Sequence, residues 1–380
     1  RTLATAGIEY DEGPDRDGGV GPYIQSDRMS IYRKYAEKLV ELGGAYYCFC
    51  SKERLESIHG ENGTHTYDKH CRNLSPEEVR AKLEAGEPYV IRQKVPENVV
   101  SSYKDMVFGE ISVSSADIED GILLKSDGMP TYNFANVVDD HLMGITHVIR
   151  GTEYLSSTPK YNLIYDAFGW ERPNYMHLPP IMKDSSRKLS KRYGDANFED
   201  FIAKGYLPEA IVNYIALLGW CPKSNQEKMT MQEMIEQFDV DGLSISSSIF
   251  DETKMRWLNG EYLKAMTPEE FYKVSAPFIA KSDVGGKYDD FEISRLMQTR
   301  VDILSEIPDK IAFLADFGEY DLGMYVHQKM KVDLEVAKKA VKVSIAAVEN
   351  LNEWNEDSIK EAVKLAAEEA GMKSGQVMFS

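Results

Sequence analysis

The sequence predicts an α/β domain of the doubly wound kind, which carries an α/β insertion and is followed by an all-α C-terminal region. Three observations support this prediction. Strand-like and helical runs alternate up to about residue 195. The apolar run His147-Val148-Ile149 ends on Arg150, as expected of a parallel strand whose carboxyl end opens into a crevice. From about residue 265 onward, apolar residues recur only at helical spacing.

The first 130 residues begin with a turn and one amphipathic helix. Within residues 1–45 the apolar positions at helical spacing are Ile31, Tyr32, Tyr35, Ala36, Leu39 and Val40. Residues 46–130 alternate short strands with loops, because residues 89–92 and 111–114 have strand composition. Ser75 followed by Pro76 predicts a helix that begins there. We therefore expect residues 46–130 to form the insertion.

The rest of the chain changes from mixed to purely helical signals. Residues 131–195 return to strands and helices and should complete the α/β domain. Residues 196–264 are helical, with one helix beginning near Pro208, and residues 265–380 begin with a second start signal at Thr267 and Pro268. We expect a separate helical region in each of these two segments.

Composition restricts the class of protein. The chain has 380 residues, enough for two to four domains, and its 43% hydrophobic and 28% charged residues are ordinary for a globular protein. No apolar run approaches the length of a membrane span. Four cysteines favour a reducing compartment, so we expect a cytoplasmic protein with no membrane association. The net charge of −18 argues against a nucleic-acid partner but does not exclude a local basic surface.

A run of cations follows the last predicted strand of the α/β domain. Arg187-Lys188-Leu189-Ser190-Lys191-Arg192 holds four cations in six residues, which cannot lie unpaired in a core. One interpretation is a solvated basic loop. The other is a mobile loop whose lysines bind phosphate.

Together with Thr131–His141 and Val148–Glu153, this run resembles the signature segments of class I aminoacyl-tRNA synthetases, and more specifically bacterial glutamyl-tRNA synthetases. The resemblance extends over essentially the whole chain. It implies a Rossmann-like catalytic domain (residues 1–45 and 131–195), an acceptor-binding insertion (46–130), a stem-contact domain (196–264) and an anticodon-binding region (265–380). The family's His-x-Gly-His motif does not occur here, so we expect a chain truncated at both ends and inactive by itself.

The activity implied by this resemblance is a glutamate–tRNA ligase that works through glutamyl-adenylate and uses ATP with Mg²⁺. The implied partners are tRNA(Glu) and L-glutamate, and we expect a monomer. An alternative is a non-catalytic tRNA-binding protein, or a paralogue without the ATP-binding N-terminus. The long helical C-terminal region argues against the short paralogue of the family, which lacks such domains.

Family position assigns the catalytic and ATP-binding residues. Lys188 and Lys191 would be the phosphate-binding lysines, a role that suits cations on a loop that closes as charge develops on pyrophosphate. The resemblance places these residues at ATP: Glu153, Ile181, Met182, Lys188, Ser190, Lys191 and Arg192. The backbone around Ile181 and Met182 would face the adenine.

Tyr132, Asn136 and Arg150 form the expected glutamate pocket. Glutamate carries two carboxylates and one ammonium, so its pocket needs a guanidinium and neutral hydrogen-bonding groups. Tyr132 and Asn136 are four residues apart, on one face of a helix. The alternative is that Tyr132 packs and Asn136 caps. The adjacent Asp139-Asp140 could bind Mg²⁺ or serve structural hydrogen bonding.

Cys48, Cys50, Tyr67 and Cys71 have a spacing that could hold one tetrahedral zinc. Related glutamate enzymes carry such a site, with His or Tyr as the fourth ligand, and His65 and His70 are substitutes nearby in the sequence. Free reduced cysteines are the alternative. Cys221, next to Trp220, is expected to be a buried small hydrophobe.

One residue of the C-terminal region is singled out by the resemblance. Arg300 aligns with an arginine that some relatives use on the third anticodon base, and a guanidinium suits base-edge recognition and stacking. The alternative is a solvated side chain or a local helical pair.

Overall fold

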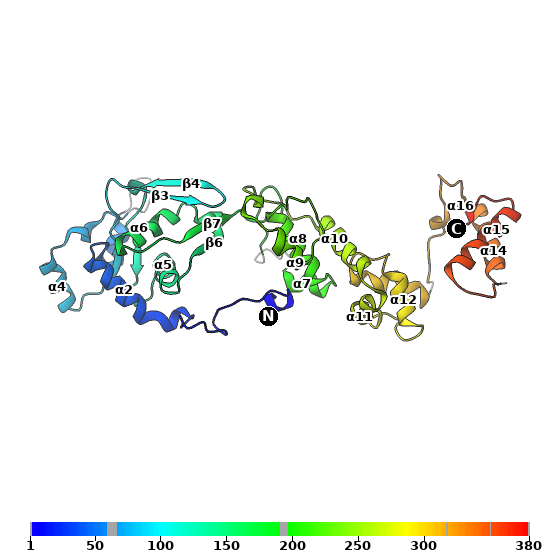
Figure 1. Cartoon of the computed structure of the whole chain (residues 1–380), viewed down its shortest axis with the longest axis horizontal. Helices are drawn as coiled ribbons and strands as arrows, with labels where there is room; N and C mark the ends of the chain where they lie inside the picture. Colours follow the sequence, from blue (N-terminus) through cyan, green and yellow to red (C-terminus); the bar gives the residue numbers. More distant parts are fainter. Residues whose placement is uncertain (1, 59–66, 191–196, 317, 350, 379–380) are drawn as a thin grey trace. The chain divides into compact units, whose positions relative to one another are not determined.

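The structure is a computed structural model that describes residues 2–58, 67–190, 197–316, 318–349 and 351–378 (Figure 1). The chain divides into two compact units. The first unit comprises Arg1–Ser275 and Phe291–Glu306, and the second comprises Ala276–Asp290 and Ile307–Ser380. The predicted α/β part lies wholly within the first unit.

Two small sheets organise the α/β part. The first has the strand order β1-β2-β5 and is antiparallel, with β1 Ala45–Cys48, β2 Val90–Gln93 and β5 Ile122–Leu124. The second has the order β4-β3-β7-β6, with β3 Val100–Asp105, β4 Gly109–Ser114, β6 His147–Gly151 and β7 Asn174–Leu178. In this second sheet β3, β7 and β6 run parallel, while β4 forms an antiparallel hairpin with β3.

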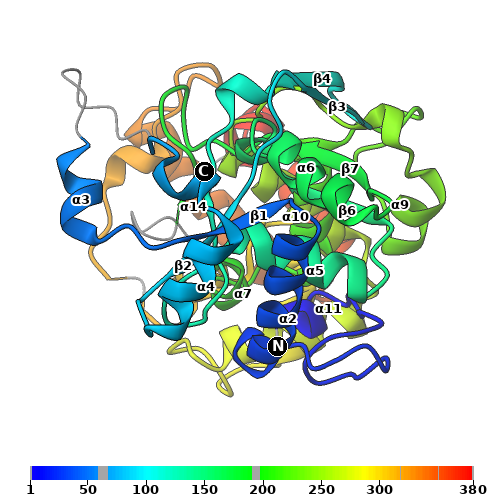
Figure 2. The same ribbon diagram turned by 90° about the vertical axis from the view of Figure 1, so that its left-hand side faces the viewer.

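Three helices supply the main core of this part. They are α2 Met29–Glu41, α5 Tyr132–Leu142 and α6 Thr158–Phe168, and α6 packs beside β3 with α5 beside α6 (Figures 1 and 2). The predicted apolar stripe of α2 is confirmed, because Tyr32, Ala36 and Leu39 are fully buried. They meet Phe134 and Val138 of α5 in one cluster.

The strands of the expected insertion are shared between the two sheets. The predicted strands at 89–92 and 111–114 correspond to β2 and β4, and the predicted helix start is confirmed by α4 Pro76–Glu84. Ser75 and Glu78 form a full capping box at its first turn. However, β3 pairs with β7, which follows the expected insertion in the chain. The insertion is therefore interlocked with the parallel sheet, and its boundaries remain a prediction.

Helices make up the rest of the first unit. Their bounds are α1 Thr2–Thr5, α3 Lys52–Ser57, α7 Phe198–Ala203, α8 Pro208–Gly219, α9 Met231–Gln237, α10 Glu252–Ala265, α11 Pro268–Ile279 and α12 Asp290–Met297, of which α11 and α12 extend into the second unit. Pro208 begins α8 as predicted. Ile211 and Tyr214 of α8 pack on Met255 and Leu258 of α10.

The second unit is helical, as predicted for the C-terminal region. Its remaining helices are α13 Ile307–Ile311, α14 Leu334–Glu349, α15 Glu356–Glu369 and α16 Ser374–Val377. Ala340 of α14, Val363 and Ala367 of α15 and Val377 of α16 form its buried cluster. Thr267 and Glu270 exchange hydrogen bonds at the start of α11, which confirms the second start signal.

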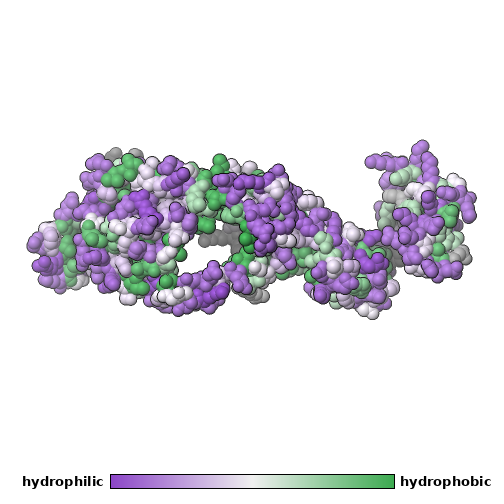
Figure 3. Space-filling view, in the orientation of Figure 1, coloured by the Kyte–Doolittle hydropathy of each residue, from purple (hydrophilic) through white to green (hydrophobic). Residues whose placement is uncertain are grey.

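The face in Figure 3 is mostly hydrophilic, with hydrophobic patches scattered over it. None of the helices in the part of the chain that the structure describes is long and apolar enough to cross a membrane. One expectation about burial is wrong: Cys221 is exposed, because it lies in the extended segment after α8, between the buried Trp220 and Pro222.

Candidate active site

The expected glutamate residues come together where α5 faces β6. Tyr132 is the first residue of α5 and is half exposed, and Asn136 follows one turn later. The Asn136 side-chain amide donates to the Tyr132 carbonyl at 2.9 Å. This bond holds the Asn136 side chain against the first turn and leaves its amide oxygen as an acceptor.

Arg150 lies in β6, and its side chain is 10% exposed. Its central carbon lies 5.9 Å from the ring of Tyr132, 5.6 Å from that of Tyr154 and 5.2 Å from that of Tyr161. Three aromatic rings within about 6 Å favour a cation and exclude water from it. Nη2 of Arg150 pairs with Asp140 at 3.4 Å, but Nη1 is buried and has no hydrogen-bond partner. A buried donor without a partner is costly unless a ligand satisfies it.

The two adjacent carboxylates of α5 have different partners. Asp139 accepts from Nε of Arg28 and from the hydroxyl of Tyr32, both at 2.8 Å. Asp140 makes only the long contact with Arg150, and burial raises its pKa to about 6, against the opposing effect of Arg150. Since each carboxylate faces an arginine, the geometry favours structural hydrogen bonding over the Mg²⁺ alternative.

The chain that leads to the basic run leaves β7 at the same edge of the sheet as Arg150. Strands β6 and β7 are parallel, with Arg150 opposite His177 and Gly151 opposite Leu178. The chain that leaves β7 therefore starts beside the glutamate residues, as ligand sites of doubly wound sheets do.

Beyond β7, residues 181–189 fold into a short hairpin. The Leu189 amide donates to the Ile181 carbonyl at 3.0 Å, and the Lys183 amide donates to the Arg187 carbonyl at 2.8 Å. Asp184 holds the turn by accepting from the amides of Ser186 and Arg187.

Lys188 is exposed on this hairpin and Ser190 is partly buried after it. Lys191 and Arg192, the other expected ATP-binding cations, lie outside the described residues.

The backbone of Met182 is already fully used. Its amide donates to the Ser248 carbonyl and its carbonyl accepts from the Phe250 amide, both at 2.8 Å. Adenine recognition by this segment would therefore fall to Ile181 or to a rearranged Met182. Glu153, also expected near ATP, is exposed in the turn directly after β6.

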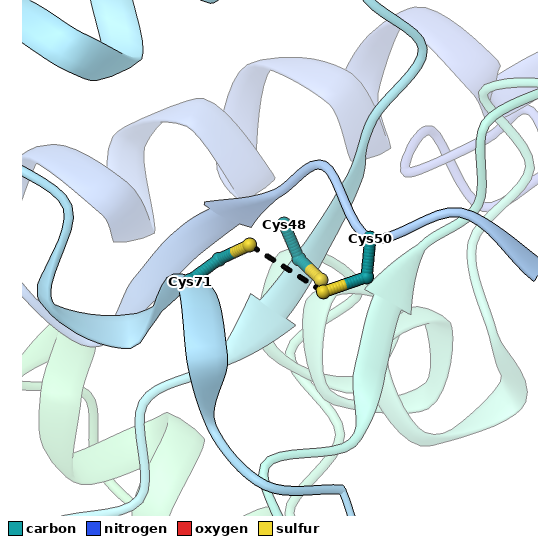
Figure 4. A group of neighbouring side chains, drawn as sticks. All are labelled: Cys48, Cys50 and Cys71. Carbon is teal, nitrogen blue, oxygen red and sulfur yellow. Dashed lines mark hydrogen bonds between the residues drawn. The ribbon is translucent and has the colours of Figure 1, made fainter. Parts of the chain in front are cut away.

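The three expected cysteine ligands converge (Figure 4), and the Tyr67 hydroxyl lies beside them. Sγ of Cys50 lies 3.6 Å from Sγ of Cys71 and 3.7 Å from the Tyr67 hydroxyl, which is 3.3 Å from Sγ of Cys48. Burial raises the pKa of Cys50 to about 12, and burial also raises that of Tyr67.

Two guanidinium groups border these ligands. The Arg92 guanidinium lies 3.9 Å from the Tyr67 ring centre, and that of Arg54 lies 3.6 Å from Sγ of Cys50. Positive charge of this kind favours anionic ligands.

Sequence reasoning missed three parts of these sites. Tyr154 and Tyr161, which enclose Arg150, look like ordinary packing residues in the sequence. The partnership of Asp140 with Arg150 could have been suspected only from charge. The buried pair of Arg72 and Asp120, 2.6 Å apart beside the cysteine cluster, carries no sequence signal.

Arg300 lies apart from these sites in the chain, just after α12. It is exposed and donates to the Leu296 carbonyl at 2.6 Å, which matches the expected alternative of a local helical contact. Such a contact leaves other N–H groups of the guanidinium for a ligand.

Two family models match the chain. Residues 1–257 match the family described as tRNA synthetases class I (E and Q), catalytic domain, and residues 231–380 match the family described as anticodon binding domain. The glutamate–tRNA ligase of Clostridium novyi is 50% identical over 100% of this chain and 78% of its own length. That of Clostridium acetobutylicum is 49% identical, over 100% and 79%.

Solved structures show the same likeness. A glutamate tRNA ligase from Elizabethkingia meningosepticum, in complex with its amino acid, superposes with a TM-score of 0.85 at 32% identity, covering 100% of this chain and 80% of that one. The glutamate–tRNA synthetase of Elizabethkingia anophelis gives 0.82 at 33% identity, covering 100% and 81%.

Proposed function

The chain belongs to the glutamate–tRNA ligases of class I, and we propose that it activates L-glutamate with ATP and transfers it to tRNA(Glu) through the residues assigned below. The reaction has two steps. The glutamate α-carboxylate attacks the α-phosphorus of ATP and releases pyrophosphate, and a ribose hydroxyl of tRNA then displaces AMP. The protein must align the first attack and stabilise charge on the leaving pyrophosphate.

One observation carries the assignment of the amino-acid pocket. Arg150 presents a buried Nη1 donor that has no partner, inside a ring of three tyrosines and next to the first turn of α5. A carboxylate is the ligand that best satisfies an unpaired guanidinium donor in a site from which water is excluded. Tyr132 and Asn136 would complete the pocket with neutral hydrogen-bonding groups.

The ATP site would be formed along the edge that follows β6 and β7. ATP with Mg²⁺ is the energy source of the class I family, and the ion would neutralise phosphate charge. Lys188, exposed on the hairpin of residues 181–189, would be one of the lysines that contact the phosphates. Lys191, Ser190 and Arg192 keep the roles that the family motif gives them, with Glu153, Ile181 and Met182 near the nucleoside.

The cysteine cluster would hold one structural zinc ion. A tetrahedral zinc with bonds of about 2.3 Å has ligand–ligand edges of about 3.8 Å. The distances of 3.6 and 3.7 Å that Cys50 makes to Cys71 and Tyr67 fit those edges. Cys48, Cys50, Cys71 and Tyr67 would be the ligands, and the ion would fix the segment around residues 48–71 without taking part in the chemistry.

The remaining assignments concern tRNA binding, oligomeric state and cellular location. The match to an anticodon-binding family supports recognition of the anticodon by the helical region, with Arg300 as one contact. A monomer suffices, because Tyr132, Asn136 and Arg150 all come from one chain. Four free thiols support a reducing, cytoplasmic setting.

The pocket is tested by Arg150→Ala, made in the complete enzyme, in the glutamate-dependent exchange of pyrophosphate into ATP, with tRNA present. We expect the KM for glutamate to rise at least about tenfold, or about 1.4 kcal/mol, because the variant loses the charged partner of a carboxylate. The KM for ATP should change by no more than a few-fold. Arg172→Ala, which removes a guanidinium from an exposed ion pair with Asp166, is the control and should change neither.

Two results would contradict the proposal. If Arg150→Ala weakens ATP and leaves glutamate unchanged, Arg150 belongs to the nucleotide site. If the complete enzyme that contains this chain binds tRNA but exchanges no pyrophosphate at any glutamate concentration, the alternative of a non-catalytic tRNA-binding protein is correct.

A further inference from the structure

The pairing of Arg150 with Asp140 gives the glutamate pocket an internal competitor. Arg150 is 10% exposed and Asp140 22% exposed, so water screens their charges only weakly. Their 3.4 Å contact is longer than a good charge-assisted hydrogen bond. A glutamate carboxylate that reaches Nη1 of Arg150 must therefore approach a carboxylate that already shares the same guanidinium.

The groups that face Asp140 from the neighbouring elements are known. Arg150 on β6 is the cation that acts on it, and Asp139, its neighbour on α5, is itself held by Arg28. Tyr132 at the start of α5, Tyr165 on α6 and Tyr175 on β7 are the titratable neighbours, and burial raises the pKa of each of them above its usual range. These tyrosines therefore stay neutral at physiological pH.

We propose that Asp140 is a proton-linked counter-ion of the glutamate site: it weakens glutamate binding while ionised, and it takes up a proton when glutamate binds. This inference rests on the proposed function, because it needs the glutamate carboxylate to lie at Arg150. The proton comes from solvent and converts the Asp140 carboxylate into a carboxyl group. Arg150 then has one anionic partner instead of two.

The sign of the effect follows from the charges. Asp140 has a pKa of about 6 without ligand, raised chiefly by burial. A second carboxylate at Arg150 raises it further, because like charges disfavour ionisation. Between pH 6 and this higher value, binding takes up a proton, so glutamate affinity must rise as the pH falls. Below about pH 6 the carboxyl is protonated in both states, and the affinity should level off.

Isothermal titration calorimetry of the purified protein with L-glutamate tests this directly. Between pH 8 and pH 6 we expect the Kd of the wild type to fall by about tenfold. Uptake of one proton per site limits this fall to about tenfold per pH unit. At pH 7, titrations in buffers of different ionisation enthalpy should show net proton uptake. A Kd that stays constant over this range, without proton uptake, overturns the proposal.

Variants separate the inference from its premise. Asp140→Asn keeps the shape and the acceptor for Arg150 but has no charge, so at pH 8 it should bind glutamate about tenfold more tightly than the wild type. Its Kd should also be nearly independent of pH. Asp166→Asn, in the exposed pair with Arg172, is the matched control and should behave as the wild type.

Weaker binding by Asp140→Asn would show that Asp140 contacts the glutamate ammonium instead, and would overturn the proposal. If Arg150→Ala binds glutamate as tightly as the wild type, the proposed pocket itself fails. The two failures are therefore distinguishable.

Discussion

Two arginine–aspartate pairs in the first unit, one buried and one partly buried, share their chemistry but not their surroundings. Arg72 and Asp120 lie 2.6 Å apart, and the carboxylate also accepts from the Tyr46 hydroxyl and the Val95 amide. Nη2 of Arg72 donates to the Val95 carbonyl at 2.7 Å. Arg150 and Asp140, by contrast, meet at 3.4 Å, and Nη1 of Arg150 has no partner.

This difference distinguishes a structural ion pair from the pair in the proposed binding site. Removing one partner of a buried ion pair whose groups are all hydrogen-bonded leaves the other charge buried and unpaired. The cost therefore appears in the free energy of unfolding. A pair with an unsatisfied donor is instead poised to gain from a ligand. Arg28, paired with Asp139, also has a buried Nη2 without a partner among the described residues, so the unsatisfied donor supports the proposed pocket only together with the tyrosines around Arg150.

The largest expected effect comes from Asp120→Ala. It leaves Arg72 buried without its carboxylate and should lower the free energy of unfolding by about 3–5 kcal/mol. Urea denaturation measures this, with Asp166→Ala in an exposed pair as the control, for which we expect at most about 1 kcal/mol. The folded variant should bind glutamate as the wild type does. A loss of stability no greater than that of the control would remove the distinction drawn between the two pairs.

Removal of the zinc ion should lower the stability of the fold, as loss of the Arg72–Asp120 pair does. Arg92 contacts the Tyr67 ring and donates to the Asp120 carbonyl, so the cysteine cluster and the Arg72–Asp120 pair adjoin. At free zinc of about 100 times its Kd, we expect a stabilisation of about 2.7 kcal/mol that chelation or Cys71→Ser abolishes. Glutamate affinity should not change.

Elemental analysis and thiol titration decide between zinc and free cysteines. If protein purified in the presence of excess zinc contains no metal and its cysteine thiols react freely, the alternative of reduced cysteines is correct.

The smallest expected effect comes from Arg300→Ala, which represents an exposed arginine. Stability should change by less than about 0.5 kcal/mol, as for most surface substitutions. The KM for tRNA should rise a few-fold, with the KM for glutamate unchanged, since the guanidinium contacts only a local carbonyl. Aminoacylation kinetics at several tRNA concentrations measures this. An unchanged KM for tRNA would remove Arg300 from the RNA surface.

Much of the fold could be predicted because its signals are local. The apolar stripe of α2, the capping box before α4 and the proline at the start of α8 are sequence patterns with a physical cause within one helical turn. The pairing of β3 with β7 joins residues 70 positions apart in the chain, and periodicity cannot reveal it.

The residues of the proposed site also differ in whether the sequence could indicate them. Tyr132, Asn136 and Arg150 were predicted as glutamate residues from the resemblance; the structure places Arg150 5.9 Å from the Tyr132 ring and bonds Asn136 to the Tyr132 carbonyl. Tyr154 and Tyr161 were missed because their role depends on the turn after β6 and on the face of α6, both set by tertiary packing. Cys221 was wrongly expected to be buried, since its apolar neighbours say nothing about where α8 ends.

The in-register pairing of β6 with β7 also limits how this protein can evolve. Arg150 and His177 are direct partners in that ladder. Inserting or deleting one residue before Arg150 within β6 would turn its side chain to the opposite face of the sheet, away from α5 and α6. Differences in length between related enzymes should therefore accumulate in the connections that leave the sheet. Such changes can alter affinity for tRNA while leaving the choice of amino acid intact.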